Sequence, residues 1–147
     1  MTRIDFYVLP TSDAQNRRLL ACRLAEKAYR QGMKTYLHTA SEEEDRIMDD
    51  LLWTFRQGSF VPHERQTVPE AQRQDVAVVI GHTAPPDDIR DLVINLSQET
   101  PRSFERFERM AELVDQDESL RQQGRRRYRI YQEQGHPLAT HRLDAVG

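Results

Sequence analysis

The stretch VAVVIG at Val76–Gly81 decides the fold of this 147-residue chain. Its apolar residues follow one another without a polar interruption until the glycine, which predicts a strand buried on both faces. Strands of this kind occur in parallel sheets whose two sides are covered by helices. The segments on either side should therefore alternate between strands and helices.

Two helices with well-marked ends precede this strand. Apolar residues recur four apart between Asp13 and Gln31, and Gly32 ends the segment. A second helix is expected to begin at the capping box Ser41-Glu42-Glu43-Glu44 and to end near Gly58. Both helices have an amphipathic pattern that predicts packing against one side of a sheet.

Strands alternate with helices along the rest of the chain. The expected strands are Ile4–Leu9, Met33–Thr39, Val76–Ile80, Leu92–Leu96 and Met110–Val114. Later helices are expected at Ser103–Arg109 and from Asp115 to about Gln134. Irregular connections are expected at Phe60–Asp75 and Thr83–Asp88. The residues after Gly135 are expected to close the chain without a further element. This alternation predicts an α/β fold, a three-layer Rossmann-like domain with a mostly parallel sheet flanked by helices.

Length and composition narrow the class of protein. One domain is expected at residues 1–143, with 144–147 as a frayed tail. Lys and Arg total 21 against 24 Asp and Glu, so the net charge of −3 excludes a protein that coats nucleic acid by overall charge. The single cysteine, Cys22, excludes an intrachain disulfide and fits a reducing compartment. The N-terminus does not resemble a signal peptide and no apolar run approaches ~20 residues, so we expect a cytoplasmic protein.

Neither a cofactor nor a metal is indicated by the motifs. The first strand-to-helix turn, Leu9–Asn16, contains no glycine, whereas a phosphate cradle needs glycines for close backbone approach. No two histidines are spaced i, i+4 as in a helical zinc site. The acidic run Glu42–Asp50 is typical of a solvated helix start. We expect no catalytic residues and no enzyme activity, and a nucleotide-dependent enzyme is disfavoured by the glycine-free turn.

The basic segment RQQGRRRYR at Arg121–Arg129 is the sharpest charge anomaly. At 100° per residue, one face of the predicted helix carries Arg121, Arg125, Tyr128 and Arg129. The adjoining face, with Gly124, is expected to pack against the sheet. Two interpretations are open: a solvated basic helix, or a strip that binds carboxylates and an aromatic ring. Such a strip suits either an acidic peptide or a nucleic-acid backbone.

A large aromatic side chain lies off the apolar face of the second helix. Trp53 points about 100° away from the nearest core residue of that helix. The apolar stretch Phe60-Val61-Pro62 follows within a polar connection. Together these residues form either a small docking patch for another protein or a satellite cluster in which Phe60 folds over Trp53.

Two segments resemble a known family, the chi subunit of bacterial DNA polymerase III holoenzyme. They are LLWTFRQGSFVPH at Leu51–His63 and DESLRQQGRRRYRIYQEQG at Asp117–Gly135. The opening strand IDFYVL and the chain length fit the same family. The resemblance implies a Rossmann-like adaptor without catalytic activity or cofactor, acting in DNA replication. It also implies pairing with the psi subunit of the clamp-loader complex and binding of the acidic C-terminal tail of single-stranded-DNA-binding protein.

The resemblance assigns residues to each partner. The tail-binding positions of the family match Arg121, Arg125, Tyr128 and Arg129, with Val114 as an addition to the pocket wall. Its psi-facing aromatic positions match Trp53 and Phe60. Contact with the clamp loader and with single-stranded DNA would then be indirect. The alternative is a protein that binds single-stranded nucleic acid directly through the same helix, to which Arg126 and Arg127 would add charge.

Overall fold

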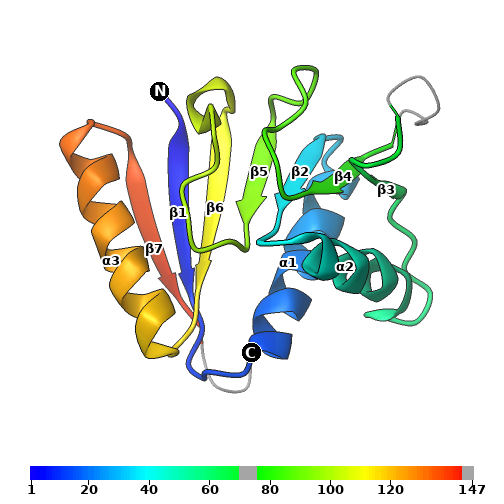
Figure 1. Cartoon of the computed structure of the whole chain (residues 1–147), viewed down its shortest axis with the longest axis horizontal. Coiled ribbons are helices and arrows are strands. Elements are labelled where there is room, and N and C mark those ends of the chain that lie inside the picture. The colour runs from blue at the N-terminus through cyan, green and yellow to red at the C-terminus, as the bar shows by residue number, and fades with distance from the viewer. Residues whose placement is uncertain (70–75, 144–147) are drawn as a thin grey trace.

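A single sheet of parallel strands runs through the molecule (Figure 1). The computed structural model describes residues 1–69 and 76–143, so the tail expected at 144–147 and the end of the connection expected at 60–75 lie outside the description. Within the described residues the strand order is β3-β4-β2-β5-β6-β1-β7 and every neighbouring pair is parallel. The strands are β1 (Arg3–Val8), β2 (Thr35–His38), β3 (His63–Arg65), β4 (Val78–Gly81), β5 (Leu92–Asn95), β6 (Arg109–Val114) and β7 (Leu138–Arg142).

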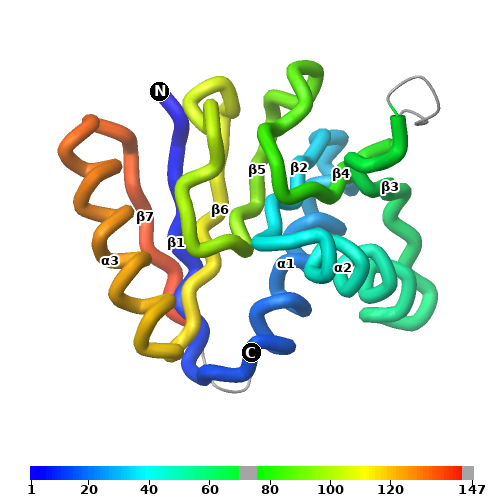
Figure 2. The backbone as a smooth tube through the Cα atoms, viewed as in Figure 1, coloured from blue at the N-terminus to red at the C-terminus, as the bar shows by residue number. Residues whose placement is uncertain are grey.

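Helices cover both faces of this sheet. They are α1 (Ala14–Arg30), α2 (Glu42–Thr54) and α3 (Glu118–Glu133), with a short 3-10 turn η1 (Phe104–Arg106). One core cluster joins α1 and α2 to one face of the sheet, and a second joins α3 and η1 to the other face. Figure 2 shows α3 running beside β7 and β1, whereas α2 lies near β4 at the opposite end of the sheet. The expected three-layer α/β fold is confirmed.

The strand that decided the fold is as buried as its sequence predicts. Val78 and Ile80 contribute to the core on the α1 face, and Val79 to the core on the α3 face. A strand with apolar side chains on both faces must be covered on both. The core cluster with α1 and α2 covers one face, and the cluster with α3 and η1 covers the other.

Two strands were missed by the sequence prediction. β3 has the sequence HER where a connection was expected, and β7 has the sequence LATHR where an irregular tail was expected. Both are edge strands in the sheet order, and apart from the buried His63 their side chains are half-buried or exposed. An edge strand needs no continuous apolar run, because pairing of its backbone with one neighbour holds it in place. The irregular connection and tail predicted at these positions were therefore wrong.

Side-chain caps set the helix starts. The Asp13 carboxylate accepts from the backbone N–H of Gln15 at 2.9 Å, and Ser41 Oγ accepts from that of Glu44 at 3.2 Å. Only this half of the expected capping box is present, because the Glu44 carboxylate instead pairs with Arg18 of α1 at 2.6 Å. That ion pair ties the start of α2 to α1.

Candidate functional site

A groove of about 520 Å³ opens between α3 and the strands β1, β6 and β7. We call it the α3 groove. All the residues that the sequence assigned to tail binding line it: Val114, Arg121, Arg125, Tyr128 and Arg129. The structure thus brings one residue of β6 together with four residues of α3.

The α3 wall of the groove is cationic. Arg125 and Arg129 are exposed and Arg121 is half-buried. Within residues 1–69 and 76–143 no carboxylate forms an ion pair with any of these guanidinium groups. Their hydrogen-bond donors are therefore available to an anionic ligand, and guanidinium groups suit carboxylates because they can donate two parallel hydrogen bonds.

The floor of the groove is apolar. Phe6 of β1 and Val114 of β6 are buried there, and the Tyr128 ring lies 5.2 Å from the Phe6 ring between centroids, tilted by 59°. Gly124 of α3 lies over Val114, where an added Cβ would come within 3.0 Å of the Val114 Cγ2 atom. The glycine thus allows the close approach of α3 to β6 that the sequence predicted. A cationic rim over such a floor can hold an anionic peptide that carries an apolar side chain.

A buried polar network fixes the rotation of α3. Glu112 of β6 is fully buried and its carboxylate accepts two hydrogen bonds from the Arg127 guanidinium, at 3.1 and 3.2 Å. The Tyr131 hydroxyl donates to the same carboxylate at 2.6 Å, and the Asn95 amide donates to it at 2.9 Å. Burial, followed by the nearby Glu112 charge, raises the pKa of Tyr131. Because this face of α3 is held inward, the face that carries Arg121, Arg125, Tyr128 and Arg129 is turned toward the groove.

The position of Arg127 corrects one sequence interpretation. Its side chain was counted among the charges available to nucleic acid, but it is only 6% exposed. Its third contact is a hydrogen bond of 2.8 Å to the Gln98 carbonyl oxygen, so its charge is used inside the protein. The helical spacing predicts this inward position, because Arg127 lies three residues after Gly124 and seven residues after Leu120, on the packed face of the helix. Arg126, in contrast, is exposed.

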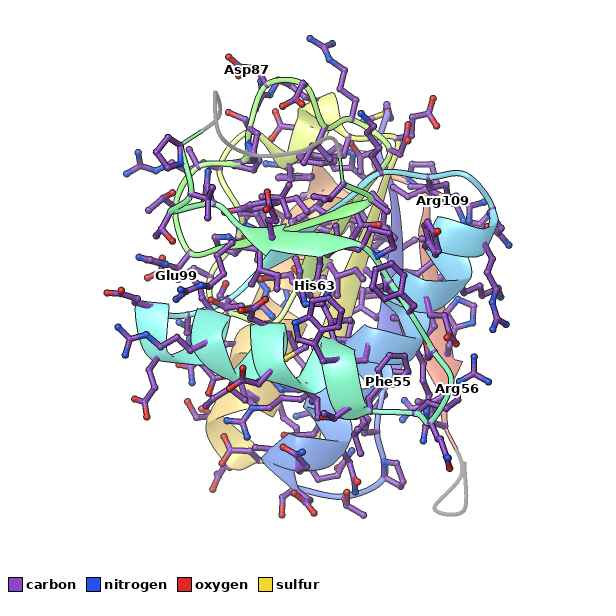
Figure 3. The ribbon with its side chains drawn as sticks, turned by 90° about the vertical axis from the view of Figure 1, so that its right-hand side faces the viewer. Phe55, Arg56, His63, Asp87, Glu99 and Arg109 are labelled. Atoms are coloured by element: carbon purple, nitrogen blue, oxygen red, sulfur yellow. The ribbon has the colours of Figure 1, made fainter. Side chains whose placement is uncertain are left out.

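The second candidate surface lies at the end of α2. Trp53 is 52% exposed and Phe60 is 60% exposed, and their ring centroids are 5.5 Å apart. The Trp53 ring also lies 4.6 Å from the ring of His63, which Figure 3 shows beside the last turns of α2. Phe60 thus packs on Trp53, as the satellite-cluster interpretation predicts, and both rings stay accessible. We call these two exposed rings the aromatic patch.

The segment that carries Phe60 is held in place on both sides. The Glu26 carboxylate of α1 accepts hydrogen bonds from Arg56, at 2.6 Å, and from the Ser59 hydroxyl. Val61, expected as part of the surface stretch, is instead fully buried in the core. His63 Nδ1 donates to the Val61 carbonyl at 2.6 Å. The Phe60 ring of the aromatic patch is thus presented by a segment that contacts with Glu26 of α1 and the buried Val61 hold in place.

A further cluster of polar side chains lies at the start of α2. The Asp45 carboxylate accepts a hydrogen bond of 2.5 Å from Thr39, and its other oxygen lies 2.6 Å from His82 Nδ1. Burial lowers the pKa of the neighbouring His38 to about 4. In the described ranges no three His, Cys, Asp or Glu side chains are grouped so that they could hold a metal ion. The contacts of Asp45 with Thr39 and His82 anchor the start of α2.

Two further observations bear on the class of protein. Cys22 of α1 is fully buried, and burial raises the pKa of its thiol to about 12, so the thiol is packed and unreactive. No helix within residues 1–69 and 76–143 combines the length and the apolar character needed to cross a bilayer.

Comparison with known proteins identifies the family. Residues 1–139 match the sequence profile described as "DNA polymerase III chi subunit, HolC". A Pseudomonas aeruginosa protein named DNA polymerase III subunit chi is 45% identical over 146 residues, covering 99% of this chain and 100% of that protein. Proteins of the same name from Haemophilus influenzae and Escherichia coli are 31% and 28% identical, covering 92% and 82% of this chain and 94% and 82% of their own lengths. The chain therefore belongs to the DNA polymerase III chi subunit family.

Proposed function

We propose that this chain is a non-catalytic adaptor of the replicative DNA polymerase III holoenzyme. It binds the acidic, phenylalanine-ended C-terminal tail of single-stranded-DNA-binding protein in the α3 groove, and it pairs with the psi subunit through the aromatic patch. One observation carries the proposal. A single groove combines an apolar floor with the guanidinium groups of Arg121, Arg125 and Arg129, which have no ion pair among the described residues. The family supports the polymerase context.

Each wall of the groove matches one part of such a tail. Arg125 and Arg129 donate hydrogen bonds to carboxylates of the tail, both the terminal group and the acidic side chains. The terminal phenyl ring lies against Tyr128 and over Val114, where apolar area is buried. A cationic rim alone would bind any anion, so the apolar floor gives the preference for an aromatic end.

The proposal is tested by fluorescence anisotropy of a labelled peptide with several aspartates before a C-terminal phenylalanine. The wild-type chain is expected to bind saturably, and Arg125→Ala is expected to weaken binding at least tenfold, or ~1.4 kcal/mol. Arg126→Ala is the matched control, because it removes an exposed arginine of the same helix that does not line the groove. Absence of binding at low salt, or equal affinities of the two variants, would overturn tail capture.

Pairing with psi rests on the character of the aromatic patch. Exposed Trp is strongly enriched among the residues that dominate protein interfaces, because one side chain buries a large area. Trp53 and Phe60 are two of the few large apolar side chains that the described residues leave exposed. Their burial against a partner would remove this apolar surface from water.

Direct binding of single-stranded nucleic acid is the alternative. Arg127 is held inside the protein, which reduces the charge that the outer surface of α3 offers to nucleic acid. Titration of the chain with a labelled oligonucleotide in the absence of the tail peptide distinguishes the two. Tight, saturable oligonucleotide binding with no peptide binding would favour the alternative.

A further inference from the structure

The edge strand β7 brings an additional arginine to the α3 groove. Arg142 lines the groove and comes from a segment that the sequence did not predict as a strand. It also lies beyond residue 139, where the family match ends.

The register of β7 fixes the side on which Arg142 lies. Thr140 pairs with Phe6 and Arg142 with Val8 in the parallel ladder. Paired residues of parallel strands share a face, and Phe6 belongs to the core on the α3 side. Arg142 therefore faces the groove, opposite the arginines of α3.

The neighbours of Arg142 hold its backbone and leave its side chain available. His141, on the other face of β7, lies with Nε2 2.8 Å from the buried Asp5 carboxylate. The N–H of Leu143 donates to the Val8 carbonyl at 3.0 Å. The Arg142 side chain is exposed, and in the described parts of the chain it has no ion pair. Among residues 1–69 and 76–143 its charge is thus presented on an anchored strand without a carboxylate partner.

Arg142 and Tyr128 lie at different positions along the length of the groove. Val8 pairs with both Val114 and Arg142, so these residues lie at one level, at the carboxyl ends of the strands. Tyr128 contacts Phe6, two residues back along β1, which is about 7 Å at the usual rise per residue in a strand. A ligand in extended form covers that distance in about two residues.

We propose that Arg142 is a fourth cationic residue of the α3 groove and binds an acidic side chain of the tail upstream of its terminal phenylalanine. The inference rests on the proposed function, because it assumes that an acidic tail occupies the groove. With the phenyl ring against Tyr128, the terminal carboxylate stays near Arg125 and Arg129. An acidic side chain about two residues earlier then reaches Arg142 on the opposite wall.

The test compares Arg142→Gln with Arg126→Gln in peptide-binding titrations. Each variant removes one exposed arginine, so a general effect of net charge is the same in both. The first peptide has several aspartates before a C-terminal phenylalanine, the second has asparagines in place of these aspartates, and the third has the aspartates and an amidated terminus. Circular dichroism checks that both variants keep the fold.

We expect Arg142→Gln to weaken binding of the first peptide by about three- to fivefold, as for one exposed charge pair. Arg126→Gln should stay within about twofold of wild type. The loss from Arg142→Gln should persist with the amidated peptide and disappear with the asparagine peptide, because only the latter lacks the proposed partner.

Three results would overturn the inference, and they are distinguishable. If both variants bind alike while Arg125→Ala still loses affinity, the proposed function stands and Arg142 has no role. If the loss disappears only with the amidated peptide, Arg142 binds the terminal carboxylate. If the wild-type chain binds none of the peptides at low salt, the proposed function and the inference fail together.

Discussion

The α3 groove and the aromatic patch are built in different ways. The groove collects residues from β1, β6, α3 and β7, which span almost the whole chain, and its chemistry is charge over an apolar floor. The patch comes from Trp53 and Phe60, seven residues apart, and its chemistry is exposed aromatic area. Long-range folding is therefore needed to make the first surface, whereas a helix end and one short segment make the second.

The two surfaces are also far apart in the sheet. The groove lies at the β7 edge, while the patch lies beside His63 of β3, at the other edge of the sheet. We therefore expect both proposed partners to bind at once without competing for the same residues. The following predictions test how independent the two regions are.

The largest effect is expected from the anchor of α3. Glu112→Leu leaves the Arg127 guanidinium buried without its partner, which should lower the free energy of unfolding by about 3–5 kcal/mol. Chemical denaturation measures this loss. The double variant with Arg127→Leu should recover part of it, because no unpaired charge stays buried. Equal stability of the single and double variants would show that the unpaired Arg127 charge is not the cause of the loss.

The next effect concerns the α2 half of the molecule and depends on pH. Burial lowers the pKa of His38 from 6.5 to about 4, so between these values the unfolded chain binds a proton that the folded chain excludes. Stability should fall as the pH drops through this range, with a contribution from His38 of at most about 3 kcal/mol.

Denaturation of wild type and His38→Gln at neutral and acidic pH isolates this contribution. Carboxylates titrate in both proteins, whereas only wild type has the imidazole. The variant should therefore lose less stability on acidification. Parallel pH profiles would contradict the assignment to His38.

A smaller and local effect is expected at the aromatic patch. Trp53→Ala should weaken pairing with the psi subunit by about 2 kcal/mol or more, a factor of about thirty, while tail-peptide affinity stays within about twofold. Calorimetry with psi and anisotropy with the peptide measure the two activities. Arg46→Ala, an exposed change on the same helix, is the control. Loss of both activities would indicate misfolding rather than a lost contact.

The smallest effect is expected from a change of salt concentration, to which binding at the two surfaces should respond differently. Peptide binding in the groove should weaken as ionic strength rises from about 0.1 M to about 1 M, because the Debye length falls from about 10 Å to about 3 Å. Pairing through the aromatic patch should change little, since it depends on apolar area. The same salt dependence for both would contradict the contrast between them.

Much of the groove could be predicted from one helix. The 100° spacing already placed Arg121, Arg125, Tyr128 and Arg129 on one face, and Gly124 on the face that packs. The same spacing places Arg127 on the inward face, although the nucleic-acid alternative counts it as surface charge. Its partner Glu112 lies fifteen residues earlier on β6, and that pairing cannot be derived from the periodicity of the helix alone.

The sequence by itself determined the α/β alternation, the helix caps, the arginine face of α3 and the prominence of Trp53, because these follow from local rules that act within a few residues. Only the tertiary structure decided that β3 and β7 are edge strands, that Arg127 is held inside, and that Arg142 joins the groove. The physical reason is that edge-strand pairing and the compensation of a buried charge depend on partners distant in the chain, such as Val8 for Arg142.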